Sequence, residues 1–503
     1  MAFSNSIAKQ NKRVNMPDVL IFMSLCLEVI LCIIQSFSMS SSVNEILFFN
    51  SYVLLVGIIF YFLSVGFNKH FLIFAYILCF ALFLMGQKLF KYAQNGGYDE
   101  FLTFVFLKLS PSQYFVFTRI MYFSLFMLFA GYRFGIELVW SRRKKTSLKE
   151  STVKSNQSCL VSYKTILTIL LFICFVCSVY MQFKIVREKS SVSYTDSYLI
   201  NVDVNPIIKI GNYLFTGMVF LYLGTRPTKK QVLILLTMFL IVEGGLQLLI
   251  GRRALLAKAL LFIIWYFICY YKFDRKKLPN KYFIFLVIFA VLIIILFWLV
   301  ERSRSSSESQ FEFLDALSSF FTSTGGSDSV IANTIDKAED FPKDGIVYLL
   351  NPVKDALFDN VLVRKIVELA TGASSESFVQ GVDYVNAHDS FSHWISYLVN
   401  SELYCNGYGM GSSYIAELYL AFGFIGVCIG GLGLGIVIAI LSGIDLSSYS
   451  VTGKAIKLFL IYNLFTLPRS GLFETATNFL YFICAVLIFK CITFVLGLKL
   501  RRS

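Results

Sequence analysis

The stretch that decides the fold is YFIFLVIFAVLIIILFWLVERSRSSSESQ, residues 282–310. Its first part, 282–300, carries no charged side chain and is long enough to cross the hydrocarbon core of a bilayer. At Glu301 the composition changes abruptly to serine and charged residues, and the polar segment continues to Ser412. This change marks the point where a chain that otherwise lies in lipid enters water. A large polar segment on a membrane protein is where function is expected.

The same apolar pattern extends outward in both directions. Hydrophobic residues make up 57% of the 503 residues, charged residues only 15%, and the mean hydropathy is +0.69. These values exclude an ordinary soluble domain and predict an all-α polytopic membrane protein with about twelve transmembrane helices. We expect transmembrane helices over 1–300, a large loop over 301–412, and further helices over 413–503. The predicted spans are 19–40, 46–67, 71–90, 114–133, 165–186, 206–225, 231–250, 254–272, 282–300, 413–440, 455–468 and 472–497.

Basic residues predict the orientation of these spans. Lysine and arginine gather at 9–13, 142–145, 226–230, 272–281 and 499–502, which fall on one side of the membrane if there are twelve spans. The positive-inside rule makes that side the cytoplasm. Both termini are then cytoplasmic and the 301–412 loop, in which acids outnumber bases, faces outward.

The large loop is expected to contain short amphipathic helices. Apolar residues recur at helical spacing between Val353 and Leu369, with basic residues between them. This pattern is typical of a helix that lies along a membrane surface. A shorter helix of the same kind is predicted over 311–317.

Glycines mark the tenth span as a packing surface. Gly426 and Gly430, and again Gly431 and Gly435, are four residues apart. This spacing lets the backbone of one membrane helix approach another closely.

Two charges inside predicted spans flank Gly251. Glu243 precedes and Lys258 follows this turn, which places the two groups at similar depth in antiparallel helices. Ionisable groups in lipid are costly and usually have a partner or a task. We therefore predict that they form a structural ion pair or share a polar pocket.

Arginines occur at the predicted outer ends of several spans. They are Arg252 and Arg253 after Gly251, Arg469 between the last two spans, and Arg119 in the fourth. A single outer arginine is commonly an anchor whose charged end reaches the interface. Several on one face indicate an anion site, because guanidinium groups bind phosphate oxygens in pairs.

The remaining candidates are histidines and carboxylates. His388 and His393 lie late in the loop, and histidine is suited to proton transfer near neutral pH. Their spacing does not favour a shared metal ion, so no metal site is expected. Glu417 and Glu474 stand at the outer ends of two spans, where each could serve as a helix-end charge only.

Residues 407–419, GYGMGSSYIAELY, followed by FGFIG at 422–426, resemble the O-antigen polymerase (Wzy-type) family. The Gly251-Arg252-Arg253 turn, Arg469 and the layout of the whole chain also fit. The resemblance implies a GT-C-like glycosyltransferase of the bacterial inner membrane that polymerises undecaprenyl-diphosphate-linked oligosaccharide repeat units.

The resemblance also implies roles for the candidate residues. His388, or failing it Glu417, would act as the catalytic base. The substrate and its diphosphate would be bound by Arg252, Arg253, Arg469, Arg119, His393 and Glu474. No cofactor, metal or nucleic acid is expected. The partners would be the lipid-linked oligosaccharides, membrane lipid and a chain-length regulator protein.

Other classes of membrane protein share part of this pattern. An O-antigen ligase would differ only in its acceptor. A lipid-linked oligosaccharide flippase or other transporter would also need about twelve spans, but such proteins usually show repeat symmetry, which this sequence lacks. A membrane scaffold or sensor would not need the outer arginines.

Overall fold

The protein is described by a computed structural model over residues 16–66, 70–146, 157–189, 192, 196–200, 202–249, 252–270, 326–371, 380–443 and 450–495. Within these ranges the regular secondary structure is helical apart from one short hairpin. The predicted all-α membrane class is confirmed.

Eight helices of the described part are long and apolar enough to cross a membrane, and a bent pair makes a ninth. The bent pair is α4 (Phe71–Leu84) with α5 (Gly86–Asn95), and its axes differ by 49°. The long helices are α2 (Met16–Ser38), α3 (Ser41–Val65), α7 (Pro111–Thr146), α8 (Gln157–Lys189), α9 (Pro206–Gly224), α10 (Lys229–Leu240) continued through the π-helix η3 (Ile241–Gly245) to α11 (Leu246–Leu249), α21 (Tyr414–Gly443) and α23 (Ala476–Val495).

The described residues therefore show fewer spans than the twelve predicted. The predicted span 455–468 is α22 (Val451–Leu464), which at about 1.5 Å per residue is too short for the hydrocarbon core. It ends early because Pro468, just beyond it, lacks a backbone donor and cannot continue a helix. The span 254–272 is represented by α12 (Arg253–Trp265) and the π-helix η4 (Tyr266–Tyr270). The span 282–300 lies outside the described residues.

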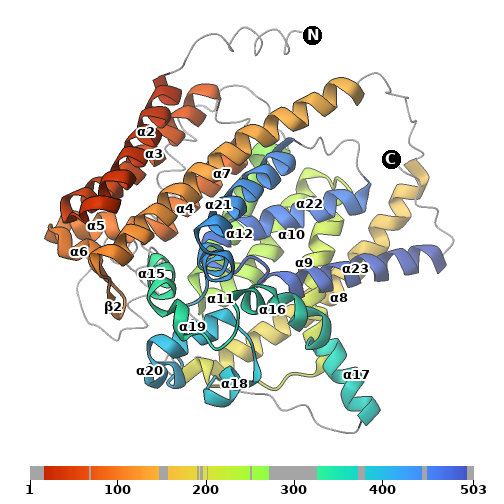
Figure 1. Cartoon of the computed structure of the whole chain (residues 1–503). Helices are drawn as coiled ribbons and strands as arrows, with labels where there is room; N and C mark the ends of the chain where they lie inside the picture. Colours follow the sequence, from red (N-terminus) through yellow and green to blue (C-terminus); the bar gives the residue numbers. More distant parts are fainter. Residues whose placement is uncertain are drawn as a thin grey trace.

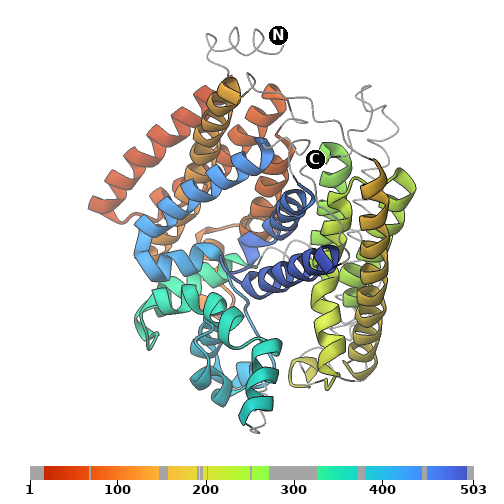
Figure 2. The same cartoon turned by 90° about the vertical axis from the view of Figure 1, so that its right-hand side faces the viewer.

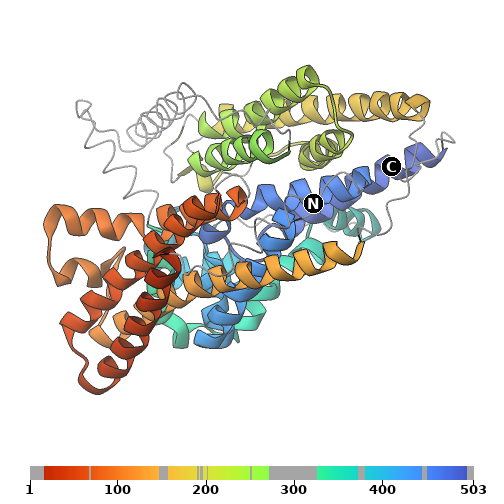
Figure 3. The same ribbon diagram turned by 90° about the horizontal axis from the view of Figure 1, so that it is seen from above.

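The helices form two groups joined by the C-terminal helices. Figures 1 and 2 show α2 to α7 with α21 on one side, and α8 to α12 on the other. Helices α22 and α23 lie between them, as the view from above shows (Figure 3). Helix α9 packs against α8, α22 and α23 and so ties the second group to the C-terminal helices.

Close backbone packing joins α7 to α21. A Cβ atom added at Gly435 would lie 2.1 Å from the carbonyl oxygen of Leu128, and one at Gly131 would lie 2.1 Å from that of Leu432. The prediction that the glycines of the tenth span pack against another helix is confirmed at Gly431 and Gly435.

The other two glycines of this span pack differently because α21 is broken. Gly423 has φ +62° and ψ −154°, outside the helical region and readily adopted only by glycine. The first part of α21 therefore turns relative to the second. Gly426 and Gly430 contact Leu418 of that first part, not a separate helix.

The loop forms a cap of short helices at one end of the bundle (Figures 1 and 2). They are α15 (Asp328–Lys337), α16 (Gly345–Phe358), α17 (Val361–Thr371), α18 (Val382–Ala387), α19 (Phe391–Val399) and α20 (Ser401–Cys405). The single amphipathic helix predicted around 353–369 is instead two helices, because the Asn360 side chain accepts from the amides of Leu362 and Val363 and starts α17 anew. The predicted helix over 311–317 lies outside the described residues.

The first of these helices, α15, packs against a short hairpin. Strands β1 (Thr103–Phe104) and β2 (Leu107–Lys108) pair in antiparallel register with Thr103 opposite Lys108. The Asn333 side chain of α15 donates to the carbonyl of Val105, and the Val105 amide donates to Ser329. The cap is thus anchored on the N-terminal group of helices.

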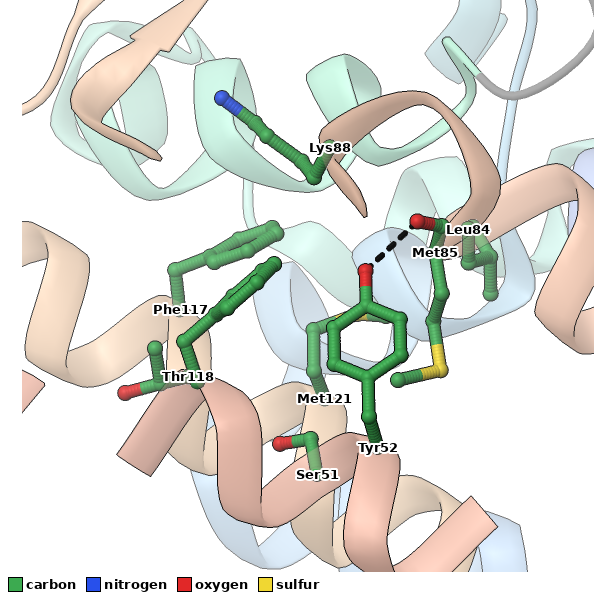
Figure 4. A pocket seen from close by; sticks show the side chains of 9 residues that line it. Ser51, Tyr52, Leu84, Met85, Lys88, Phe117, Thr118 and Met121 are labelled. Carbon is green, nitrogen blue, oxygen red and sulfur yellow. Dashed lines mark hydrogen bonds between the residues drawn. The ribbon is translucent and has the colours of Figure 1, made fainter. Parts of the chain in front are cut away.

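A small cavity lies beneath this anchor, between α3, α5 and α7 (Figure 4). Tyr52 closes one side and donates to the carbonyl of Met85 at 2.7 Å. Lys88 lines the cavity with its stem, and its ammonium group donates to the carbonyls of Glu100 and Phe101 at 3.1 and 2.9 Å. Asp328, fully buried at the start of α15, supplies the main countercharge.

Candidate functional site

The first cluster of predicted site residues surrounds the turn between α22 and α23. Glu417, in the first turn of α21, is buried and accepts two hydrogen bonds. Ser412 donates to its Oε1 at 2.8 Å, and the amide of Leu472 donates to its Oε2 at 2.8 Å. Glu474 accepts from the amide of Gly471 at 2.9 Å. Both carboxylates therefore bind the backbone of one turn.

Lys258 connects this turn to a third carboxylate, Glu243. It lies within electrostatic range of Glu474 and Glu243, donates to Asn463 at 2.7 Å, and sits 4.1 Å from the centre of the Tyr462 ring. The Tyr462 hydroxyl in turn donates to Glu243 at 3.3 Å. Among the residues that the structure describes, Glu243 and Lys258 form no direct salt bridge. Both groups contact Tyr462 instead.

The four candidate arginines lie in three different places. Arg469 ends the 3-10 helix η7 (Leu467–Arg469) and is exposed on the turn that Glu417 and Glu474 bind. Arg252 and Arg253 begin α12, the helix that carries Lys258 about 8 Å further along its axis. Arg253 is buried, whereas Arg252 is exposed.

Arg119 lies elsewhere, at the bend of α21. Its guanidinium group sits 4.6 Å from the ring centre of Phe424 and 5.2 Å from that of Phe115. Its Nε atom is buried and has no hydrogen-bond acceptor within the described ranges. The sequence did not predict this contact because the break at Gly423 brings Phe424 into place.

The second cluster is built around Tyr384 in α18. Its ring lies between those of His388 and His393, with centres 4.3 Å from each. His388 Nδ1 donates to the Tyr384 carbonyl at 3.1 Å, and its Nε2 lies 3.6 Å from Asp359 Oδ2. His393 Nδ1 bonds to the hydroxyl of Tyr404 at 2.8 Å. The two predicted histidines are therefore brought together by aromatic stacking.

Burial and neighbouring charges shift the pKa values of His393 and Asp359. Arg364 donates to both oxygens of Asp359 at 2.7 and 2.6 Å and lowers the pKa of that carboxyl below its ordinary value. Burial, and secondarily the charge of His388, lowers the pKa of His393 to about 4. His393 is therefore neutral near pH 7, and Asp359 is ionised.

Sequence reasoning missed Asp359, Arg364 and Tyr384. Asp359 and Arg364 are five residues apart across the junction of α16 and α17, so their pairing depends on a helix break that periodicity did not indicate. No local motif distinguishes Tyr384 from the other tyrosines of this chain.

The two clusters are separate groups joined by α16. The start of this helix packs on α21, where a Cβ atom at Gly345 would lie 2.3 Å from the Leu420 carbonyl oxygen. Asp359 follows its end. In the part of the chain that the structure describes, no group of three or more His, Cys, Asp or Glu residues could hold a metal ion.

Comparison with known proteins identifies the chain. The model of the family described as O-antigen polysaccharide polymerase Wzy matches residues 20–499. No curated protein and no solved structure matches the sequence significantly. The match covers nearly all of the chain, including both clusters. The chain therefore belongs to the O-antigen polysaccharide polymerase Wzy family, whose members are multi-pass membrane glycosyltransferases that polymerise lipid-linked oligosaccharide repeat units.

Proposed function

We propose that this polymerase works at the outer face of the bacterial inner membrane on repeat units carried by undecaprenyl diphosphate. The observation that carries the proposal is the family match over 20–499, which selects a polymerase over a ligase or a flippase. Both termini then lie in the cytoplasm and the 301–412 loop faces outward, as the basic residues of the connections favour. A chain-length regulator remains a proposed partner.

The proposed reaction is a glycosyl transfer between two lipid-linked chains. The bond between the anomeric carbon of the growing polymer and its diphosphate breaks, and the diphosphate leaves with the electron pair. A hydroxyl of the incoming repeat unit forms the new glycosidic bond and gives up its proton. The products are undecaprenyl diphosphate and a polymer longer by one unit on the acceptor's carrier.

Arginines are proposed to stabilise the leaving diphosphate. Negative charge develops there as the bond breaks, and fixed cations lower the energy of that state. Arg469 suits this role because its turn is held by buried side chains. We propose the same role for Arg252 and Arg253, which lie at the start of α12, and for Arg119, which lies at the bend of α21.

His388 is the proposed base. Because its Nδ1 donates to the Tyr384 carbonyl, Nε2 is the nitrogen that can accept a proton. Asp359, 3.6 Å from Nε2, would stabilise the imidazolium that results. Glu417 is less suited because both of its oxygens already accept hydrogen bonds. His393, held by Tyr404, would keep Tyr384 against His388.

The first experiment is the polysaccharide ladder of a deletion strain, read on a gel. Complementation with the wild-type gene should restore the ladder, and Arg469→Ala should leave single repeats on the surface while the protein stays in the membrane. Arg133→Ala is the matched control, since Arg133 pairs with the partly exposed Asp18 away from both clusters. Repeats trapped on the carrier inside the cell would instead indicate a flippase.

Two measurements test the proposed chemistry. His388→Ala should lower the rate of polymerisation by about 10²–10⁴ if His388 is the base. His70→Gln, at the remaining histidine, is the control. A loss below tenfold at His388 would contradict its role. Metal independence predicts that a chelator leaves the rate unchanged, and inhibition reversed by a divalent ion would refute it.

A further inference from the structure

The turn that carries Arg469 is fixed from both sides by side chains of other segments. Before Arg469, the carbonyl of Pro468 accepts from the hydroxyl of Ser413 at 3.1 Å. After it, the amides of Gly471 and Leu472 donate to Glu474 and Glu417. The backbone on each side of Arg469 is therefore held, and all three bonds depend on side chains outside the 3-10 helix itself.

Packing adds a steric constraint to these hydrogen bonds. A Cβ atom at Gly471 would lie 2.2 Å from Glu417 Oε1 and 2.9 Å from its carboxyl carbon. Any side chain at position 471 would therefore displace the Glu417 carboxylate or the turn. The absence of a Cβ lets the carboxylate lie directly against the turn.

The hydrogen bonds of Glu417 leave little capacity for catalysis. Oε1 accepts from Ser412 and Oε2 from Leu472, and the residue as a whole is 3% exposed. A general base must reach the proton that it removes. A carboxylate with both oxygens engaged and almost no exposed surface is better placed to hold backbone than to meet a substrate hydroxyl.

We propose that Glu417 is a positioning residue: with Glu474, it shapes the 468–474 turn so that Arg469 is presented to the diphosphate of the donor. The inference rests on the proposed role of Arg469 and deepens it. Lys258 supports the same arrangement, because it lies within electrostatic range of Glu474 and partly balances its buried negative charge.

Replacement by glutamine separates positioning from proton transfer. In Glu417→Gln the amide oxygen can accept from the Leu472 amide, and the amide NH₂ can donate to the Ser412 hydroxyl, which accepts as well as donates. Both bonds survive, but the ability to take up a proton is lost. We expect Glu417→Gln to keep the rate of polymerisation within about tenfold of wild type, and Glu417→Ala to lose about a hundredfold or more.

The assay uses the purified full-length protein in detergent with a lipid-diphosphate-linked repeat unit, and measures kcat and KM. A glutamine variant as inactive as the alanine variant would overturn the proposal and restore Glu417 as a base. Full activity in both variants would overturn it as well, because the turn would then not need the carboxylate.

Two glycine substitutions test the same turn without replacing an ionisable side chain. Gly471→Ala should lose activity like Glu417→Ala, because its methyl group meets Oε1. Gly433→Ala in the same helix as Glu417 is the matched control, since a Cβ there meets no atom within 4 Å. Equal activity of the two glycine variants would contradict the proposed geometry.

Coupling to Arg469 separates positioning from general stability. If Glu417 acts through Arg469, Glu417→Ala should lower the residual rate of an Arg469→Ala variant by less than about threefold, because that variant already lacks the side chain that Glu417 positions. Independent, additive losses would refute positioning. If Arg469→Ala itself polymerises normally, the proposed function of Arg469 fails, which is a different result from the failure of Glu417.

Discussion

Replacing Gly435 by alanine should loosen the contact between α7 and α21. The added methyl carbon would lie 2.1 Å from the carbonyl oxygen of Leu128 and 2.6 Å from the amide nitrogen of Tyr132. A carbon and a carbonyl oxygen normally approach no closer than about 3.3 Å. The helix backbones would have to separate by about 1 Å, since both clashing atoms are backbone and cannot rotate away.

The expected cost of this overpacking is about 1–3 kcal/mol. Alanine also favours a helix over glycine by about 1 kcal/mol, which would hide part of the effect. Gly433→Ala gains the same helix propensity, but its methyl group meets no atom within 4 Å. The difference between the two variants therefore isolates the packing cost.

The two full-length variants should be compared by thermal unfolding in detergent and by the polysaccharide ladder. Gly435→Ala should unfold several degrees below Gly433→Ala and yield less long polymer, because α21 also carries the first turn that holds Glu417. Equal unfolding temperatures would refute the close approach of the helices, whatever the effect on the ladder.

Two further predictions concern the loop. Lys88→Met should lower the free energy of unfolding by about 1–3 kcal/mol, because the carbonyls of Glu100 and Phe101 lose their donor and the buried Asp328 loses its main countercharge, and adding Asp328→Asn should recover part of the loss in thermal unfolding. The pKa of His393 is about 4 in the folded protein against an ordinary 6.5, so protonation favours unfolding. Stability relative to His393→Gln should fall as the pH drops from 6.5 to 4, by up to about 3 kcal/mol, and parallel pH profiles would contradict this.

The hydropathy pattern predicted helices well in segments where the bilayer constrains the backbone. In a bilayer every backbone polar group must bond internally, so long apolar segments become helices whatever they pack against. Spans such as 19–40 and 206–225 therefore correspond closely to α2 and α9. Hydropathy was a weaker guide at 455–468, where the structure has the shorter helix α22, which ends at Leu464 before Pro468.

The sequence by itself determined the membrane class and the family, and it indicated the polar loop and the candidate residues. These depend on composition and on short motifs, which are local. Only the tertiary structure decided which of those residues share a site. Glu417 meets Gly471 and Leu472 across α21 and the turn before α23, and His388 meets Asp359 from another loop helix. Such contacts depend on helix breaks at Gly423 and Asn360 and on backbone distances that no periodicity encodes, because distant segments are brought together only when the helices pack.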